Sequence, residues 1–275
     1  MKDLYAVMGN PVTHSQSPFI HTQFAKQTGQ SLRYLKIEVP LHGFQVALQE
    51  FIVRGGKGLN ITAPLKQQAF TAMTQNTKSA TIAHAVNTIS LQTKGELFGD
   101  NTDGIGLLRD LTINHRYSIA NKAVLILGGG GAVRGILFPL LSEKPKLLML
   151  ANRTLEKAIA IRDEFHDIGK IEVSRLDDIE GSFDLIINCM NLADETLDLK
   201  LPLTIYTKST FCYDLMYGQS VTPFLKWAVS NGIAHLANGI GMLVEQAAES
   251  FYIWRGIKPN TGPIIEMLKE YSYQS

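Results

Sequence analysis

A lysine stands close to the expected start of a helix in the stretch GLNITAPLK, residues 58–66. Proline is favoured at the first helical position, so we expect Pro64 to begin the helix and Lys66 to lie two residues further in. Free backbone N–H groups and the helix dipole make the potential positive there, which disfavours an ammonium group. Lys66 therefore needs a compensating partner, and a purely structural role does not explain it.

Glycines mark a second chemical feature, AVLILGGGGAVRG at residues 123–135. An apolar strand runs directly into Gly128, Gly129, Gly130 and Gly131, and a helical pattern follows from Ala132. Glycines let the chain turn tightly and approach a pyrophosphate, whose charge would rest on the N–H groups of the helix. The third glycine of the usual G-x-G-x-x-G pattern falls on Val133. The alternative is a glycine-rich turn without a ligand, but the position between strand and helix favours a dinucleotide site.

The next strand ends in LANRTLEKA, about 24 residues beyond Gly128. An NAD enzyme would place an acid here for the ribose 2′-hydroxyl. Instead Asn152, Arg153 and Thr154 open a helix, and Lys157 follows one turn on, where the dipole prefers anions. The alternative is a helix cap by Asn152 or Thr154 with a solvated Arg153. We predict NADP(H) rather than NAD(H), because a bound 2′-phosphate would neutralise these cations.

Four further polar stretches follow apolar runs in the amino-terminal third: GNPVTHSQSP (9–18), GLNITAPLK (58–66), AVNT (85–88) and GDNTDG (99–104). The polar residues of these stretches each have a plain structural interpretation, with the exception of Lys66. Ser17 before Pro18 would cap a helix, Asn87 would satisfy a turn, and Asp103 would cap a helix beginning near Gly104. No Cys/His/Glu spacing predicts a metal site.

Composition limits the remaining classes of function. The chain has 275 residues, 45% of them hydrophobic, with 26 basic and 25 acidic side chains, so attraction to nucleic acid or to an anionic membrane is not expected. Cys189 and Cys212 both adjoin apolar runs, which is a poor basis for a disulfide framework. No apolar stretch approaches the ~18 residues of a membrane span. We expect a soluble, cytoplasmic protein.

The elements that position these residues alternate between strands and helices. Strands separated by helices are typical of βαβ units with mostly parallel sheets, whose ligands lie at the carboxyl ends of the strands. The sequence therefore predicts an α/β fold. The expected strands cover residues 4–9, 33–39, 59–62, 123–128, 147–152, 184–188, 210–215 and 233–237.

In this order, the quoted stretches resemble the shikimate dehydrogenase family over nearly the whole chain. The family interconverts 3-dehydroshikimate and shikimate with NADP(H), a step of aromatic amino-acid biosynthesis through chorismate. The stretches that carry the resemblance are HSQSP (14–18), GLNITAPLK, AVNT, GDNTDG, the glycine loop, NRT (152–154), YDLMYG (213–218) and NGIGMLVEQAA (238–248).

The resemblance implies a role for each matching residue. Lys66 and Asp103 match the catalytic pair: the helix start would weaken the hold of Lys66 on its proton and Asp103 would strengthen it, so that Lys66 can act as acid and base. Asp103 also belongs to the substrate site. The serines that match Ser15 and Ser17 bind the substrate carboxylate, and hydrogen bonds to its hydroxyls or carboxylate come from positions matching Thr62, Asn87, Tyr217 and Gln246.

For the cofactor, the resemblance implies contacts from Gly128 to Ala132, from Asn152, Arg153, Thr154 and Lys157, and from Leu215 and Gly239. The family fold has two α/β domains with a cleft between them, which are expected to close on the substrate. Residues 1–103 plus 239–275 would form the substrate-binding catalytic domain, and residues 104–238 a Rossmann-type NADP-binding domain with a doubly wound parallel sheet. Whether the protein is a monomer or a homodimer stays open.

Three departures from the family pattern stand out. The loop at 188–193 reads Asn-Cys-Met-Asn-Leu-Ala instead of Asn-Ala-Thr-x-x-Gly, Asn238 replaces an aspartate, and Leu215 replaces a methionine. Two alternatives remain open. One is a quinate/shikimate dehydrogenase with broader substrate and NAD use, against which Arg153 argues. The other is a non-catalytic NADP(H)-binding sensor, against which the presence of both Lys66 and Asp103 argues.

Overall fold

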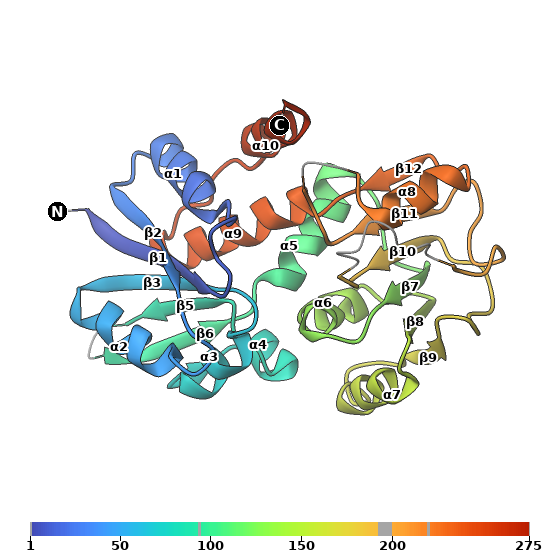
Figure 1. Ribbon diagram of the computed structural model, residues 1–275, viewed down its shortest axis with the longest axis horizontal. Helices are drawn as coiled ribbons and strands as arrows, with labels where there is room; N and C mark the ends of the chain where they lie inside the picture. The colour runs from blue at the N-terminus through green and yellow to red at the C-terminus, as the bar shows by residue number, and fades with distance from the viewer. Residues whose placement is uncertain (1, 93–94, 192–199, 219–220, 275) are drawn as a thin grey trace. The chain divides into compact units, whose positions relative to one another are not determined.

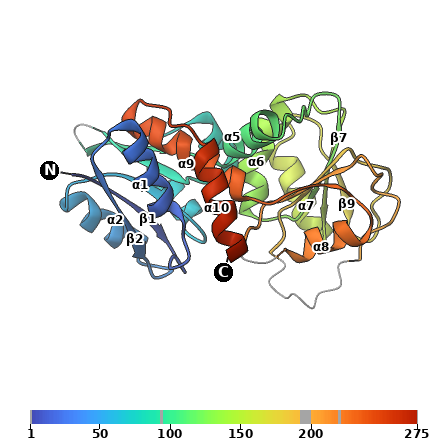
Figure 2. The same ribbon diagram turned by 90° about the horizontal axis from the view of Figure 1, so that it is seen from above.

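The computed structural model describes residues 2–92, 95–191, 200–218 and 221–274 (Figures 1 and 2). The chain divides into two compact units. The first comprises Met1–Leu107 and Leu243–Ile265, and the second comprises Leu108–Met242 and Glu266–Ser275. The chain therefore passes between the units three times, within helix α5 (Asp103–Arg109), within helix α9 (Ile240–Arg255) and within helix α10 (Gly262–Gln274).

The first unit is built on a six-stranded mixed sheet of order β2-β1-β3-β5-β6-β4. Its strands are β1 (Asp3–Gly9), β2 (Leu32–Glu38), β3 (Gly56–Ile61), β4 (Gln75–Asn76), β5 (Thr88–Leu91) and β6 (Leu97–Asp100). Its helices include α1 (Ser17–Thr28), α2 (Phe44–Val53), α3 (Lys66–Ala72) and α4 (Lys78–Ala83).

Alternate residues of β1 are buried on opposite faces of this sheet, because successive strand side chains point to opposite sides. Ala6 and Met8 belong to a core cluster with Phe44 and Leu48 of α2. Tyr5 and Val7 face the other way, into a smaller cluster that Trp254 of α9 covers. Figure 1 accordingly shows α1 and α9 on one side of the sheet and α2, α3 and α4 on the other.

Strand β5 runs antiparallel to both of its neighbours, β3 and β6. The first residue of β5, Thr88, lies opposite Asn60 near the end of β3 and opposite Asp100 at the end of β6. The AVNT and GDNTDG stretches therefore meet at the same edge of the sheet as the residues that follow β3. This one reversal of direction brings together segments about 40 residues apart in the sequence.

The second unit contains an all-parallel sheet of order β12-β11-β10-β7-β8-β9. Its strands are β7 (Ala123–Leu127), β8 (Leu147–Asn152), β9 (Glu172–Arg175), β10 (Leu185–Asn188), β11 (Phe211–Asp214) and β12 (His235–Ala237). The remaining helices are α6 (Gly131–Ser142), α7 (Leu155–Glu164), α8 (Pro223–Ser230) and α10 (Gly262–Gln274).

Helices cover both faces of the second sheet (Figure 2). Leu125 and Leu127 of β7 share a core cluster with Phe224 of α8, while α6 buries its own apolar residues elsewhere. The strand order reverses between β7 and β10, and ligands of such sheets bind outside the carboxyl ends of the strands at the reversal. The predicted α/β class, with a Rossmann-type parallel sheet, is confirmed.

All eight expected strands occur, with ends within a few residues of the expected ones. The sequence pattern missed β4, β5, β6 and β9, which are only two to four residues long. The expectation that Pro64 starts a helix is wrong, because α3 begins at Lys66 with Leu65 at the cap position. Lys66 still lies in the first turn.

Two expected helix caps also differ. Helix α1 begins at Ser17 itself, and Ser15 Oγ accepts the Ser17 N–H at 3.3 Å, so Ser17 is not the cap. Helix α5 begins at Asp103, whose N–H donates to Asn101 Oδ1 at 3.2 Å. In both cases the side chain two residues earlier accepts the hydrogen bond, which frees the Ser17 and Asp103 side chains for other contacts.

A buried carboxylate, Asp110, stabilises the second unit where α5 continues into a π-helical turn. Tyr213 donates to it at 2.6 Å and Asn114 at 2.9 Å, and His115 Nε2 lies 3.6 Å away. Burial alone would raise the pKa of Asp110, but the hydrogen bonds from His115, Tyr213 and Asn114 outweigh burial and hold its pKa below the usual value. Folding therefore favours the ionised form.

We expect Asp110→Asn to lower the free energy of unfolding by about 1–3 kcal/mol at neutral pH, because it leaves buried donors without their anion. Since folding lowers the pKa of Asp110, its contribution is present above the unfolded value of 3.8 and is lost as the pH falls through the lower folded value. The difference between the variant and the wild type should thus shrink below about pH 4. Urea unfolding across this range would measure it, with exposed Asp178→Asn as the control.

Candidate active site

Lys66 and Asp103 form an ion pair in the first unit. Lys66 Nζ lies 2.5 Å from Asp103 Oδ2, and the two side chains are 26% and 12% exposed. The two residues come from the first positions of two different helices, α3 and α5. The carbonyl oxygen of Lys66 also accepts the Val86 N–H at 2.9 Å, which ties the start of α3 to the AVNT segment. The ammonium group is thus held by an anion and remains partly accessible.

Asn87 holds the other oxygen of Asp103. The backbone N–H of Thr102 can only donate, and it lies 2.8 Å from Asn87 Oδ1, which fixes the orientation of the amide. Asn87 Nδ2 then donates to Asp103 Oδ1 at 2.8 Å. The Asp103 carboxylate therefore has a donor on each oxygen, as a buried charge requires.

Helix α9 adds Gln246 to this group. Gln246 Oε1 lies 3.5 Å from both Asn87 Nδ2 and Thr102 Oγ1, and its Nε2 donates to Leu243 O at 2.8 Å. One turn further on, Ser250 Oγ lies 2.7 Å from Thr88 Oγ1. Gly106 permits this approach, because a Cβ on it would lie 2.7 Å from Gln246 Cβ. Lys66, Asn87, Asp103 and Gln246 are therefore brought together.

The two serines lie after β1, at the start of α1. Ser15 Oγ donates to Ser17 Oγ at 3.2 Å, and Ser17 is 7% exposed. The loop after β1 is joined to the loop after β3, because the Asn10 N–H donates to Ala63 O at 3.1 Å. Thr62 lies in this second loop, and a Cβ on Gly9 would approach its Cγ2 to 2.2 Å. The serines and Thr62 thus belong to the same edge of the sheet.

The glycine loop of the second unit leaves a helix start open. Gly128 has φ +128°, a conformation that suits glycine, and a Cβ on Gly129 would lie 3.0 Å from Asn152 Cγ. Around Gly130 and Gly131 no heavy atom would meet an added Cβ within 4 Å. Helix α6 begins at Gly131, continues with Ala132 and has no side-chain cap. Its first N–H groups can therefore receive an anion.

The NRT stretch lies beside this loop, because β8 is the neighbour of β7 and Leu127 pairs with Ala151. Asn152 Nδ2 donates to Thr154 O at 2.8 Å, and Thr154 occupies the cap position of α7 without a side-chain hydrogen bond. The alternative considered from the sequence, a side-chain cap by Asn152 or Thr154, is therefore not what the structure shows. Arg153 and Lys157 are exposed and form no ion pair with the described residues. Two uncompensated cations thus lie at a second open helix start.

Leu215 directly follows strand β11 and Gly239 follows strand β12, and the two residues are in contact. A Cβ on Gly239 would lie 2.1 Å from Leu215 O, so only glycine allows this contact. Asp214 fixes the same turn by accepting from Asn188 Nδ2 at 2.9 Å and from Met216 N at 3.0 Å. Tyr217, 39% exposed, follows in this loop of the second unit. The expected contact of Tyr217 with the substrate remains a prediction. In the altered loop, Leu192 and Ala193 lie outside the described residues.

Comparison with known proteins gives three matching family models. Residues 7–89 match the shikimate dehydrogenase substrate binding domain, residues 111–200 match shikimate/quinate 5-dehydrogenase, and residues 239–269 match the shikimate 5′-dehydrogenase C-terminal domain. The NADP(+) shikimate dehydrogenase of Nitrosomonas eutropha is 47% identical over 98% of this chain and 97% of its own length. The corresponding enzyme of Alkalilimnicola ehrlichii is 48% identical over 98% of this chain and 99% of its own.

The chain belongs to the shikimate dehydrogenase family. Its fold is similar to that of the Thermus thermophilus shikimate 5-dehydrogenase, solved in complex with NADP(H) and shikimate, with a TM-score of 0.86 and 29% identity over 98% of this chain and 99% of the other. The resemblance stated from the sequence is thus confirmed, and the protein is an oxidoreductase of this family.

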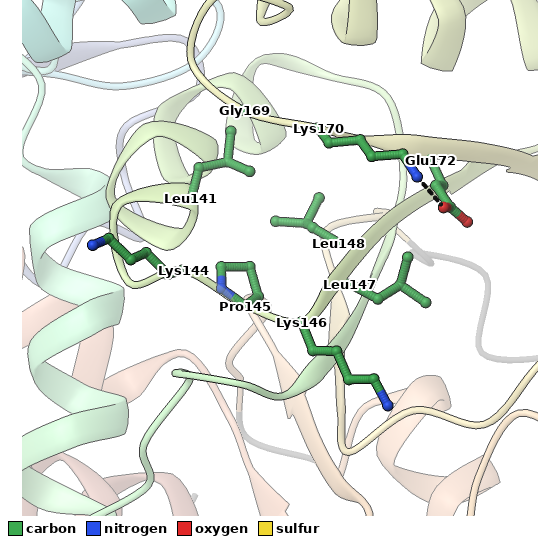
Figure 3. A pocket seen from close by; sticks show the side chains of 9 residues that line it. All are labelled: Leu141, Lys144, Pro145, Lys146, Leu147, Leu148, Gly169, Lys170 and Glu172. Atoms are coloured by element: carbon green, nitrogen blue, oxygen red, sulfur yellow. Dashed lines mark hydrogen bonds and ion pairs between the residues drawn. The ribbon is translucent and has the colours of Figure 1, made fainter.

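A separate pocket lies at the opposite end of the parallel sheet, where β8 and β9 begin (Figure 3). Lys144, Lys146 and Lys170 line it, but Figure 3 shows their ammonium groups pointing in different directions, with Lys170 paired to Glu172 at 3.0 Å. Parallel sheets bind ligands at the other end. This pocket is therefore not the cofactor site of the family fold.

Within the part of the chain that the structure describes, no helix is long and apolar enough to cross a membrane, and no cluster of three His, Cys, Asp or Glu side chains could hold a metal ion.

Residues that support the site were not identified from the sequence. Asn60, Thr102 and Ser250 are buried and hydrogen-bonded to one another or to Asn87. Asn60 and Thr102 lie inside the quoted motifs, next to residues that match functional positions of the family. The sequence therefore contained a signal that could have identified them. Ser250 had no such signal, because only the spacing of one helical turn from Gln246 relates it to the site.

We expect Gly239→Ala to lower the free energy of unfolding by about 1–3 kcal/mol, since its Cβ would overlap the Leu215 carbonyl and force backbone shifts. Gly218→Ala is the matched control, because an added Cβ there meets no heavy atom within 4 Å. Its unfolding free energy should stay within about 0.5 kcal/mol of the wild type. Denaturant titration of both variants measures the difference, and equal effects would contradict the close contact.

Proposed function

We propose that this protein catalyses the NADPH-dependent, reversible reduction of 3-dehydroshikimate to shikimate, with Lys66 as the acid/base group paired with Asp103. The observation that carries the proposal is the partly exposed ammonium group of Lys66, 2.5 Å from a buried carboxylate, among polar side chains that match the family site. The relatives named NADP(+) shikimate dehydrogenase support the choice of substrate and cofactor.

In this proposal, residues 1–103 and 239–275 form the catalytic domain and residues 104–238 bind NADP(H). The open start of α6 suits a pyrophosphate, and the space around Gly130 and Gly131 allows its close approach. Arg153 and Lys157 suit a 2′-phosphate, and Asn152 and Thr154 offer neutral partners beside them. Leu215 and Gly239 would contact the nicotinamide end. When bound, NADPH supplies the hydride for the carbonyl carbon.

Lys66 provides the proton. As the carbonyl carbon receives hydride, its oxygen gains alkoxide character, which a nearby cation stabilises and a proton donor neutralises. Lys66 Nζ–H transfers its proton to this oxygen and is reprotonated afterwards; in the reverse direction the neutral amine removes the hydroxyl proton. Asp103 holds Lys66 in place and binds the substrate hydroxyl.

The remaining polar side chains orient the ring. Ser15 and Ser17 donate to the substrate carboxylate, for which hydroxyl groups are suitable neutral donors. Thr62, Asn87, Tyr217 and Gln246 bind ring hydroxyls or the carboxylate, since neutral amides and hydroxyls fix a pose without adding charge. Asn87 already directs an N–H at Asp103, so it can fix the aspartate and the substrate at once.

Lys66→Ala should lower kcat by ~100- to 10,000-fold with a modest change in KM, because it removes the general acid. Lys66→Arg separates electrostatic stabilisation of the alkoxide from proton donation, since a guanidinium keeps the charge but does not release a proton. The exposed Lys57→Ala is the control. Steady-state kinetics with shikimate and NADP measures all three, and an unchanged kcat in Lys66→Ala would remove Lys66 from the mechanism.

Arg153→Asp should reduce the ratio of kcat/KM for NADP to that for NAD by about 10- to 100-fold, because a charged hydrogen bond to the 2′-phosphate is replaced by repulsion. Arg33→Asp, an exposed arginine in the other unit, should leave the ratio unchanged. A ratio unaltered by Arg153→Asp would contradict the role of Arg153.

The proposal as a whole is tested by the absorbance of the reduced cofactor with shikimate or quinate, each with NADP and NAD. Turnover largely confined to shikimate with NADP supports it. Comparable rates with quinate or NAD would instead indicate a broader quinate/shikimate dehydrogenase. No turnover with any pair would contradict catalysis and favour a non-catalytic NADP(H)-binding protein.

A further inference from the structure

Asn101 is a buried residue of the GDNTDG stretch to which the proposed reaction assigns no role. It is 4% exposed and lies between strand β6 and helix α5, whose first residue is Asp103. Asn101 Oδ1 accepts the Asp103 N–H at 3.2 Å, and Asn101 Nδ2 donates to Ala85 O at 3.0 Å. The side chain therefore joins the start of α5 to the AVNT stretch.

The two backbone partners of Asn101 fix the direction of its amide group. A backbone N–H can only donate, and a backbone carbonyl oxygen can only accept. The amide oxygen must therefore face the Asp103 N–H, and the amide nitrogen must face Ala85 O. Turning the amide over would set two donors against each other at Asp103 and two acceptors against each other at Ala85.

The peptide group between Ala85 and Val86 extends this connection to Lys66. The C=O of this group accepts from Asn101. Its N–H, on Val86, donates to Lys66 O at 2.9 Å. The group is planar and trans, so its C=O and N–H point in opposite directions. One rigid peptide group therefore lies between Asn101 and the backbone of Lys66.

Two asparagines cross between the AVNT and GDNTDG stretches in opposite directions. Asn87 of the first stretch donates to Asp103 Oδ1 at 2.8 Å in the second. Asn101 of the second stretch reaches back to Ala85 of the first. The backbones are also joined directly, because the Asn87 N–H donates to Asp100 O at 3.0 Å. Asn87 thus orients the Asp103 carboxylate, whereas Asn101 holds the backbone that carries it.

We propose that Asn101 is a positioning residue that sets, through this peptide group, the spacing between Lys66 and Asp103. The inference rests on the proposed function, because it takes Lys66 as the group that exchanges a proton with the substrate. The two hydrogen bonds of the Asn101 amide and the one from Val86 to Lys66 fix the two helix starts relative to each other. Without this connection, the Asp103 carboxylate would no longer hold the ammonium group in one place.

A serine at position 101 separates the two hydrogen bonds of Asn101. In Asn101→Ser the hydroxyl oxygen can still accept the Asp103 N–H, as serine does in such turns, but the shorter side chain does not reach Ala85 O. This variant should lower kcat for shikimate on the order of 10-fold, because a small misplacement of reacting groups has a large effect on rate. KM for NADP should change less than about twofold, since the proposed cofactor site is in the other unit.

Asn231 of the second unit provides the matched control. Its amide also has a partner at each end, because it donates to Trp227 O at 2.8 Å and accepts from the Tyr206 hydroxyl at 2.9 Å. Asn231→Ser removes the same chemical group far from the proposed acid/base pair, so kcat should stay at the wild-type value. Melting temperatures of both variants measure the loss of stability separately from the loss of rate.

A double-mutant cycle shows whether Asn101 acts through Lys66. In the Lys66→Ala background, Asn101→Ser should lower the remaining kcat by less than about twofold, because the amine that Asn101 positions is absent. A general structural defect would lower kcat by the same factor in both backgrounds. Should Asn101→Ser fail to fold, Asn101→Thr replaces it, since threonine keeps the hydroxyl acceptor and fills more of the original volume.

The inference and the proposed function fail in different ways. Wild-type kcat in Asn101→Ser would overturn the inference, because the hydrogen bond to the Asp103 N–H would then be sufficient alone. Equal factors in the two backgrounds of the cycle would also overturn it. In both cases the wild type still turns over shikimate. If the wild type itself does not turn over shikimate with NADP, the proposed function fails, and the positioning role of Asn101 falls with it.

Discussion

The first unit is organised around one buried carboxylate. Asp103 can stay ionised below the surface only if each oxygen has a donor, since an unpaired buried charge costs several kcal/mol. Lys66 supplies one donor and Asn87 the other, and they come from segments before and after α4. The antiparallel course of β5 is what brings Asn87 to the same edge as Lys66. The site therefore depends on the mixed sheet. If all strands of this sheet were parallel, neighbouring strands would need longer crossover connections.

The polar groups around Asp103 and those around the glycine loop are paired differently. In the first, the amides and hydroxyls of Asn60, Asn87, Thr88 and Ser250 are hydrogen-bonded to one another inside the core. Such a network is rigid, because breaking any member leaves a buried group unpaired. In the second unit the starts of α6 and α7 lack side-chain caps, and Arg153 is exposed. Open donors and free cations suit a ligand that brings several negative charges of its own, and saturated donors suit a small ligand that must be held in one pose.

The sequence predicted the α/β class and eight strands, because buried strands read as apolar runs whatever their surroundings. It missed β4 (QN), β5 (TISL), β6 (LFGD) and β9 (EVSR), which are short and in which polar residues or glycine interrupt the apolar run. The short β5 mattered most, since the pattern suggested mostly parallel strands and only long-range pairing reveals the reversal. Similarly, Pro64 fitted the helix-start preference, but α3 begins two residues later, at Lys66. Ser250 was missed because its role depends on contacts from α9 to Asn60 and Thr88 of the sheet, which no local spacing encodes.

The position of Lys66 in its helix has to be considered together with that of its partner, Asp103. Both residues occupy the first place of a helix, where the local potential is positive. That potential favours the carboxylate of Asp103 and opposes the ammonium group of Lys66, so the two helix starts act on the pair in opposite senses. In the proposed mechanism Asp103, which also has Asn87 as a donor, holds the lysine, and Lys66 exchanges the proton with the substrate. At the carboxyl-terminal end of a helix, the dipole would stabilise the ammonium group of Lys66. The two helices would then no longer act on the two charges in opposite senses. The proposed acid–base role thus depends on a placement that, for stability alone, would be unfavourable.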